Sequence, residues 1–389
     1  MQMSGGFSEI SSQSWISRLG QSIVGVLIGV VMFLVAFPLL FWNEGRAVRT
    51  AKSLEEGASV VVSTSAATVD PANEGKLVHM TAEAATEEIL TDPDFGISAK
   101  ALELRRQVEM YQWKEHVKTE TRKKIGGGQE TVKTYTYEKV WTGDVIKSSE
   151  FHERGRDEYK NPGSKPVPDR DQKVKVVKFG AFELSPGLVS MIEDKKPLAV
   201  TTEMASRLPE VTRKKYRVEE GMYYLSQDPG SPAIGDLRIR FEVIEPGTVS
   251  IISQQKGNSF QPYHAKAGDD VNLLEAGTHS AEEMFKAAQD ANRMLTWILR
   301  IVGFVVMATG VFLVFRPLTV VASVIPFLGD LLGVGVALFA GVIAFGFSLI
   351  TIAIGWVFYR PLIGIPLLLV GIGGLVGLVL LARSRRKKV

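Results

Sequence analysis

The chain has 389 residues, of which 46% are hydrophobic and 22% charged, and its formal net charge is +3. It contains no cysteine, which excludes disulfides, zinc thiolate sites and cysteine catalysis. Nine basic and two acidic residues give +7 outside residues 43–296, so that central segment carries −4. A mildly acidic segment without a basic stripe argues against nucleic-acid binding.

The first predicted membrane helix covers residues 20–42 and follows a short N-terminal tail at 1–19. About 20 apolar residues suffice for a helix to cross roughly 30 Å of hydrocarbon. The stretch is longer than a signal-peptide core and ends in bulky residues at 39–42, which indicates a retained anchor. Gly25 and Gly29 have the GxxxG spacing of closely packed helices. Ordinary glycine usage in membrane helices is the favoured explanation of that spacing.

The central segment, residues 43–296, has the composition of a soluble α+β domain with antiparallel sheets. Alternation of apolar and polar residues predicts strands at 97–118, 135–141 and 237–243. A glycine-rich tip at 123–128 is expected to join the first two strands in a hairpin. The turn Glu245-Pro246-Gly247 predicts a second hairpin, between 237–243 and 249–253. Short helices are expected at 185–193 and 201–207, and an exposed loop at 154–171.

The second membrane helix is expected to start inside the soluble domain. Ser280 followed by Glu283 has the pattern of a capping box. Residues 281–293 have helical composition, with no breaker before the apolar span at 297–315. Two interpretations stay open, a continuous rod from the domain into the bilayer and a short amphipathic connector.

Two further spans are predicted at 331–358 and 361–382, after a cytoplasmic loop at 316–330. In the last span, Gly373 and Gly377 suggest close helix packing. The basic tail at 383–389 is expected to stay cytoplasmic, because positive charges in short flanks do so. Four crossings then place the large domain on the outward or lumenal side. Basic residues at 46–52 oppose this orientation, although the rule is weak for long translocated domains.

Charged residues are scarce within the four apolar segments. No Asp, Glu, Lys or His lies deep in any of them, which argues against an ion-coupled transporter. A passive pore formed by an oligomer is not excluded by this pattern.

A polar segment at the edge of the first span is the candidate functional site. Glu44 and Arg46 follow the span directly, and the predicted topology places them on the same face as Tyr359 and Arg360. We expect these segments to dock, with Glu44 pairing Arg360. The alternative is simple helix termination with snorkelling charges.

Patterns that carry catalytic chemistry are missing from the sequence. The five histidines are scattered without metal-ligand spacing, and no GxSxG elbow occurs. Residues 126–129 lack the Gly-Lys-Ser/Thr ending of a phosphate loop. We therefore expect no catalytic residues, no cofactor and no metal site.

Several longer segments resemble the transmembrane protein 43 family, also called LUMA. They lie in order along nearly the whole chain, at residues 43–47, 54–57, 104–113, 235–238, 280–283 and 355–362. The resemblance implies four spans with a large domain between the first and second. It also implies residence in the endoplasmic reticulum and inner nuclear membrane, self-association, and contacts with lamins and emerin. The family has no established catalytic residues.

The absence of cysteine and the diverged loop at 154–171 suggest a distant, bacterial member. Lamina partners would not apply to such a member, and its location would be the bacterial inner membrane. The sequence as a whole favours a non-enzymatic membrane scaffold that forms homo-oligomers and uses its domain to bind proteins or the membrane surface. An oligomeric pore or channel-associated subunit is the alternative. A membrane enzyme acting on lipid or peptidoglycan would need a convergent polar cleft.

Overall fold

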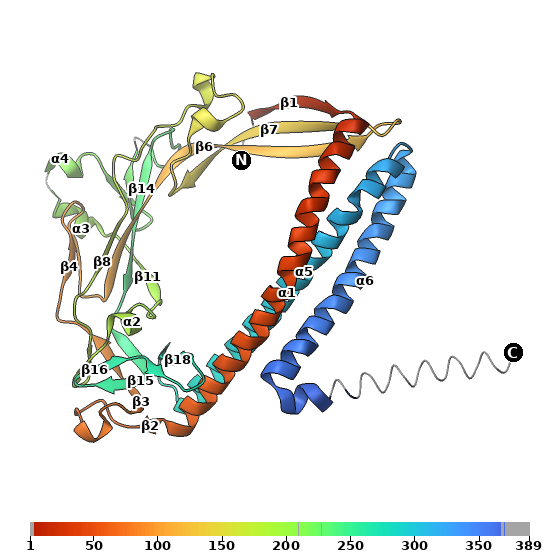
Figure 1. Cartoon of the computed structure of the whole chain (residues 1–389). Helices are drawn as coiled ribbons and strands as arrows, with labels where there is room; N and C mark the ends of the chain where they lie inside the picture. Colours follow the sequence, from red (N-terminus) through yellow and green to blue (C-terminus); the bar gives the residue numbers. More distant parts are fainter. Residues whose placement is uncertain (1–3, 209, 227, 367–368, 370–389) are drawn as a thin grey trace.

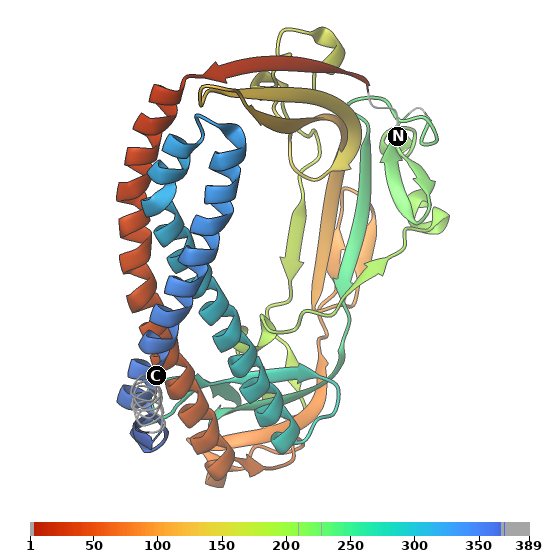
Figure 2. The same cartoon turned by 90° about the vertical axis from the view of Figure 1, so that its right-hand side faces the viewer.

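The computed structural model describes residues 4–208, 210–226, 228–366 and 369. Three long helices stand beside an arch of β-sheets that meets them at both ends (Figures 1 and 2). The helices are α1 (Trp15–Val60), α2 (Pro186–Val189), α3 (Thr202–Ser206), α4 (Glu210–Arg213), α5 (Ala281–Ala322) and α6 (Pro326–Tyr359), with 3₁₀ turns at η1 (Pro71–Asn73), η2 (Ser148–Glu150) and η3 (Asp157–Tyr159).

The strands of the described residues are mostly short, apart from the long β6 and β7. They are β1 (Ser4–Gln13), β2 (Val62–Ser63), β3 (Leu77–Ala85), β4 (Leu90–Asp92), β5 (Ile97–Ala99), β6 (Glu103–Lys123), β7 (Gln129–Thr142), β8 (Arg170–Lys173), β9 (Lys178–Phe179), β10 (Phe182–Glu183), β11 (Lys195–Leu198), β12 (Arg217–Glu219), β13 (Met222–Leu225), β14 (Leu237–Ile244), β15 (Gly247–Lys256), β16 (Ser259–Gln261), β17 (Tyr263–His264), β18 (Asp270–Val271) and β19 (Leu273–Ala276).

Helix α1 is far longer than the membrane segment that it contains. Its 46 residues extend over about 69 Å, more than twice the hydrocarbon thickness. The side chain of Ser14 caps the helix by accepting a hydrogen bond from the Ser17 N–H. The predicted span at 20–42 forms its apolar half, and residues 43–60 continue as a polar stalk towards β2.

Helix α5 is a continuous rod of 42 residues, as one of the two interpretations expected. Ser280 and Glu283 form the predicted capping box, in which each side chain bonds the backbone N–H of the other residue. The predicted span at 297–315 lies inside this helix. The first half of α5 packs beside the polar stalk of α1 and the second half beside its apolar half (Figure 2).

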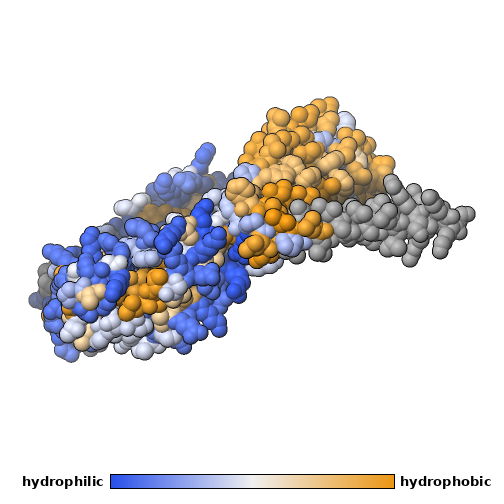
Figure 3. All heavy atoms as spheres, turned by 60° about the horizontal axis from the view of Figure 1, so that its bottom comes forward, coloured by the Kyte–Doolittle hydropathy of each residue, from blue (hydrophilic) through white to orange (hydrophobic). Residues whose placement is uncertain are grey.

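The three long helices are each long and apolar enough to cross a membrane. Figure 3 shows the hydrophobic surface gathered on this bundle and the hydrophilic surface on the β-domain. The predicted span at 331–358 lies within α6. The predicted loop at 316–330 is wrong, because α5 continues to Ala322 and α6 begins at Pro326. The fourth predicted span, at 361–382, lies outside the described residues from 370 onwards, so three candidate spans are established.

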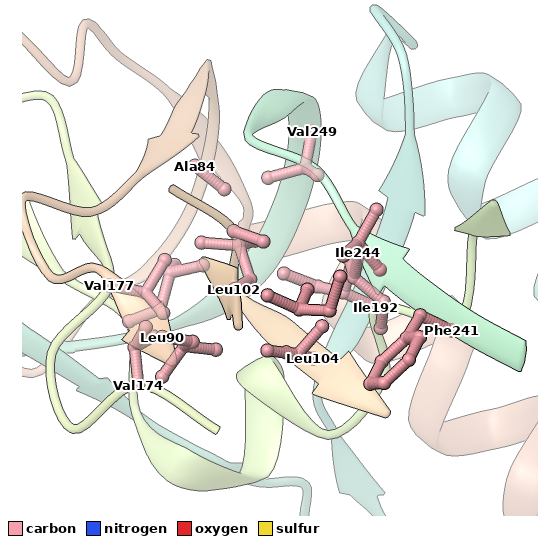
Figure 4. Packing of buried hydrophobic residues seen from close by; sticks show 14 of the residues in the cluster. Ala84, Leu90, Leu102, Leu104, Val174, Val177, Ile192, Phe241, Ile244 and Val249 are labelled. Atoms are coloured by element: carbon pink, nitrogen blue, oxygen red, sulfur yellow. The ribbon is translucent and has the colours of Figure 1, made fainter. Parts of the chain in front are cut away.

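Two large sheets, antiparallel apart from the parallel pair of β2 and β3, share the main core of the domain. The eight-stranded sheet has the order β1-β7-β6-β14-β13-β12, with β8 added to β6 and β11 to β14. The seven-stranded sheet has the order β10-β9-β3-β15-β16, with β2 and β19 at its sides. Figure 4 shows side chains from both sheets packed together, among them Leu104 and Phe241 from one and Val249 from the other.

The predicted strands are present, but one predicted hairpin is wrong. Strand β14 pairs with β6, β13 and β11, whereas β15 pairs with β3, β16 and β19. The turn before Gly247 therefore moves the chain from one sheet to the other. Both edges of β14 are already occupied, which leaves no free edge for β15.

The segment at 154–171 is irregular, as expected, but it is anchored to β6. The Asn161 amide bonds both the N–H and the C=O of Trp113, at 2.8 and 2.9 Å. The Asp169 carboxylate accepts a hydrogen bond from the Val108 N–H at 2.7 Å, and Lys165 donates to the Val108 carbonyl at 2.8 Å. These side chains satisfy backbone groups on the edge of β6 that is left free where β14 pairs with Val108 and β7 pairs with Trp113.

The N-terminal segment is a strand of the large sheet rather than a separate tail. Strand β1 pairs with β7 in antiparallel register, with Phe7 opposite Tyr135 and Ile10 opposite Val132. The hairpin of β6 and β7 has its tip at 124–128, as predicted, and this tip reaches the beginning of α1 (Figure 1).

The hairpin tip also contacts the turn between α5 and α6. The Gly126 N–H donates to the Val324 carbonyl at 3.0 Å, and Lys123 forms an ion pair with Asp330. Trp15 donates from its indole N–H to the Val320 carbonyl at 2.9 Å. The segments at 1–19 and 316–330 were expected on the side opposite the domain. The structure instead places residues 4–19 and the turn after α5 against the domain.

Candidate functional site at the membrane edge

The apolar and polar halves of α1 and α5 change over at the same level. In α1 the change follows Trp42, and in α5 it precedes Trp297. The Asn43 amide donates to the Thr296 carbonyl at 3.0 Å, and both residues are buried. A polar cluster therefore marks the level where both helices change from apolar to polar composition.

Glu44 is the centre of this cluster and is only 2% exposed. Its carboxylate accepts two hydrogen bonds from the Arg300 guanidinium, at 2.7 and 2.8 Å. The Trp356 indole N–H donates a third, at 2.8 Å. Gly355 makes room for this arrangement, because a Cβ there would lie 3.0 Å from the Glu44 side chain. The bidentate pair ties α1, α5 and α6 together at one point.

Aromatic rings enclose the guanidinium of Arg300. Its Cζ lies 4.8 Å from the centroid of the Trp297 ring and 5.6 Å from that of Trp356. Cation–π attraction adds to the ion pair where water is largely excluded. A charge that would be costly within an apolar helix is thus paired with a carboxylate and flanked by two aromatic rings.

Arg46, two residues after Glu44, continues the polar contacts between α1 and α5. It donates to the Asn292 side chain at 2.8 Å and to the Thr296 hydroxyl at 2.9 Å. Asn292 in turn donates to the Ala47 carbonyl at 3.0 Å. The buried Nε of Arg46 has no hydrogen-bond partner among the described residues. This row of bonds fixes α1 to α5 above the bundle.

The two segments that were expected to dock do lie together. The Tyr359 ring is 5.1 Å from that of Phe41, and a Cβ on Gly45 would lie 2.6 Å from its Cζ. The expected ion pair of Glu44 with Arg360 is replaced by the pair with Arg300. Sequence reasoning missed Arg300, although an arginine three residues after Trp297 in an apolar run signals a need for a buried acid.

A cavity of about 540 Å³ opens beside this cluster, between α1, α5 and the end of α6. Its lining includes three arginines, two glutamates and two tryptophans, namely Arg293, Arg300, Arg360, Glu44, Glu55, Trp297 and Trp356. Gln289, Asn292 and Thr296 add neutral polar groups. Of the three arginines, Arg360 alone forms no side-chain hydrogen bond or ion pair with another described residue.

The glycines that were expected to pack helices have different outcomes. A Cβ on Gly29 would lie 2.6 Å from the Gly310 carbonyl oxygen, and one on Gly25 would lie 4.0 Å from Leu313. This face of α1 is therefore covered by α5 of the same chain. Gly373 and Gly377 lie outside the described residues.

A second cavity, of about 480 Å³, lies in the β-domain around a buried ion pair. Arg106 bonds both oxygens of Asp92, at 3.0 and 2.9 Å, and Asp94 at 3.0 Å. Its guanidinium lies 5.0 Å from the Phe95 centroid. Burial raises the pKa of Asp92, although Arg106 opposes the shift. The arginine bonds a partner on each side, which is typical of a structural pair.

No group of three or more potential metal ligands occurs among the described residues. The titratable groups of the membrane-edge cavity come from three different helices. The Glu44–Arg300 ion pair, together with Trp356, holds these helices together, so the site has the chemistry of a structural contact beside a polar cavity.

Comparisons with known proteins give one consistent result. A family model for Transmembrane protein 43 matches residues 110–361. Transmembrane protein 43 of Rattus norvegicus is 36% identical over 360 residues, which cover 90% of this chain and 88% of the relative. The Homo sapiens protein of that name is also 36% identical, over 365 residues with the same coverage. The homolog from Drosophila melanogaster is 31% identical over 363 residues, or 89% and 91% of the two chains. No solved structure matches.

Proposed function

Because the chain belongs to the transmembrane protein 43 family, we propose that it is a non-enzymatic membrane scaffold whose β-domain binds other proteins. It is an integral membrane protein with three candidate membrane helices in the described part of the chain. Its compartment would be the endoplasmic reticulum and inner nuclear membrane in a eukaryote, or the inner membrane in a bacterium.

The observation that carries this proposal is the unbroken passage of α1 and α5 from the membrane segments into the domain. Above the membrane edge, Leu54 of α1 and Phe285 of α5 share a buried cluster with Leu77 and Ile252 of the seven-stranded sheet. Thr50 bonds Asp269 near β18. Rigid helices packed in this way would hold the domain at a fixed height and angle, as a scaffold requires.

Self-association is the second part of the proposal. The glycine face of α1 is occupied by α5, so another surface would have to join the copies. Helix α6 offers one, because Gly333, Gly341 and Gly346 have open space where a Cβ would lie. Glu44 and Arg300, which are buried where the three helices meet, bond each other, which supports a scaffold rather than a wet pore.

The sidedness of the domain is also a proposal, and two arrangements compete. The basic residues at 383–388 favour a spanning bundle with an outward domain. The contacts of the hairpin tip with Trp15 and Val324 favour another arrangement. Ten of the 21 residues of β6 are charged, so this strand cannot cross hydrocarbon beside a spanning bundle. In the second arrangement the helices lie along one membrane face, with the whole domain on one side.

Single cysteines distinguish the two arrangements, because the chain has no cysteine of its own. Ser11→Cys reports on the exposed N-terminal strand, and Ile89→Cys reports on the domain, where Ile89 is 66% exposed. Sealed vesicles are treated with a membrane-impermeant maleimide, before and after permeabilisation. Labelling of the two sites from opposite sides supports a spanning bundle. Labelling of both from the same side supports helices along one face.

Site-specific photo-crosslinking tests the scaffold function itself. A photoreactive residue replaces Ile89 on the domain or Phe345, which is 58% exposed on α6. We expect a reproducible set of proteins to be captured at residue 89 and the chain itself to be captured at residue 345. A buried position, Phe241, is the matched control. Capture at residue 89 that does not exceed the control would contradict the proposed scaffold.

A further inference from the structure

The membrane-edge cavity has features of a ligand site. Neither the Glu44–Arg300 ion pair between the helices nor the scaffold function requires these features. Its volume of about 540 Å³ falls within the range of about 300–1,000 Å³ that is common for small-ligand sites. We propose that it binds the phosphate group of an anionic phospholipid, with Arg360 as the principal contact. This inference is independent of the proposed scaffold function.

The depth of the cavity matches that of lipid headgroups. Trp297 and Trp356 line it, and tryptophan concentrates at the boundary between hydrocarbon and water. On one side lie the exposed apolar residues Ile298 and Ile301 of α5. On the other side the polar stalk begins.

The charges of the lining leave one cation without a partner among the described residues. Arg300 is neutralised by Glu44, and Arg293 pairs with Asp290 at 3.2 Å. Arg360 is exposed and forms no side-chain hydrogen bond or ion pair within the described part of the chain. Glu55 lies about 16 Å along α1 from Glu44, three helical turns away, so it cannot neutralise this end of the cavity.

The guanidinium group suits a phosphate better than other membrane components. Its planar set of N–H donors bonds two phosphate oxygens at once, whereas an uncharged lipid without phosphate offers no matching anion. Arg293 is 71% exposed, and its exposed ion pair with Asp290 is weak, so it can turn towards the same anion. The acyl chains would then lie along Ile298 and Ile301, in contact with the apolar surface of α5.

The charge of the site predicts selectivity among phospholipids. All phospholipids carry the phosphate, but a choline group adds a positive charge beside Arg360 and Arg293. An anionic headgroup such as that of phosphatidylglycerol adds none. We therefore expect phosphatidylglycerol to bind more tightly than phosphatidylcholine.

Native mass spectrometry of the full chain in neutral detergent tests the proposal. The protein is titrated with phosphatidylglycerol, with phosphatidylcholine, or with inorganic phosphate. Arg360→Gln should lower the affinity for phosphatidylglycerol at least tenfold, because a hydrogen bond to a charged group contributes about 1.5–3 kcal/mol. Arg316→Gln is the matched control, since Arg316 is exposed at the other end of the bundle and its loss changes the net charge equally.

Three results would overturn the proposal. Equal losses of affinity for phosphatidylglycerol in the Arg360 and Arg316 variants would show that net charge alone attracts the lipid. Equal affinity for phosphatidylglycerol and phosphatidylcholine would remove the predicted selectivity. Binding of inorganic phosphate that depends on Arg360, without binding of lipid, would assign the cavity to a free anion. Arg360→Lys should keep part of the affinity, and retained thermal stability would show that both variants are folded.

Discussion

Removing the carboxylate of Glu44 is the most informative perturbation of the membrane edge. Glu44→Gln keeps an acceptor for the Trp356 N–H but leaves Arg300 without its counter-charge. Breaking a buried ion pair from one side costs about 3–5 kcal/mol. Because the Arg300 side chain is 14% exposed and can turn towards water, we expect Glu44→Gln to lower the free energy of unfolding by about 3 kcal/mol, at the low end of this range.

The loss is measurable as a shift in the thermal unfolding of the purified chain. For a large domain about 1 kcal/mol corresponds to roughly 2 °C, so Glu44→Gln should lower the Tm by about 6 °C. The fluorescence of the six tryptophans reports the transition. Glu55→Gln is the matched control, since it removes an exposed carboxylate from the same cavity and should change the Tm by about 1 °C or less.

A double variant separates the ion pair from general damage. Glu44→Gln combined with Arg300→Met removes both charges and keeps the acceptor for Trp356. Replacing a complete buried pair is often neutral, so the double variant should recover most of the lost Tm. A double variant no more stable than Glu44→Gln, or a single variant as stable as the wild type, would refute the reasoning.

Three further perturbations test other parts of the structure. Gly29→Leu should lower the Tm by several degrees, because a Cβ at this position meets a backbone oxygen of α5 at 2.6 Å. Gly25→Ala should be tolerated, and equal effects of the two variants on the Tm would contradict this packing. Gly45→Val should be destabilising through its clash with the Tyr359 ring, and Tyr359→Ala should partly rescue it; absence of rescue would place the clash elsewhere. Asp169→Asn tests a pH effect. Burial raises the pKa of Asp169, but its hydrogen bonds outweigh this and lower it. The stabilisation is therefore present above the unfolded pKa of about 3.9 and is lost as pH falls below it. The Tm difference between wild type and variant should shrink between pH 5 and about pH 2, and a constant difference would exclude this linkage.

Local patterns in the sequence predicted the elements of the fold better than their partners. The period-two alternation in β6 and β14 and the capping box at Ser280 depend on neighbouring residues, and all three were confirmed. The hairpin expected at Gly247 failed, because which sheet a strand joins is decided by distant strands. The pairing of β1 with β7 is also non-local. The mostly polar residues of β1, at 4–13, lack the apolar alternation that predicts a strand.

The candidate site shows the same limit at the level of single residues. Composition placed Glu44 at the membrane edge and Tyr359 near it, because both flank apolar runs. The choice between Arg300 and Arg360 as partner depends on the rotation of α5 about its axis, which packing at Gly303 and Gly310 determines. Such a rotation cannot be obtained from the hydropathy of a helix that is apolar on all sides.

The distance between the domain and the bundle tests the central claim, that they form one rigid body, most directly. Spin labels are attached to single cysteines at Val69 on the domain and Val342 on α6, which are 37% and 71% exposed. Pulsed electron resonance on the full chain in lipid nanodiscs then gives the distribution of their separation. A single narrow distribution is the predicted result. A broad distribution would show that the domain moves freely on the bundle and would contradict the account.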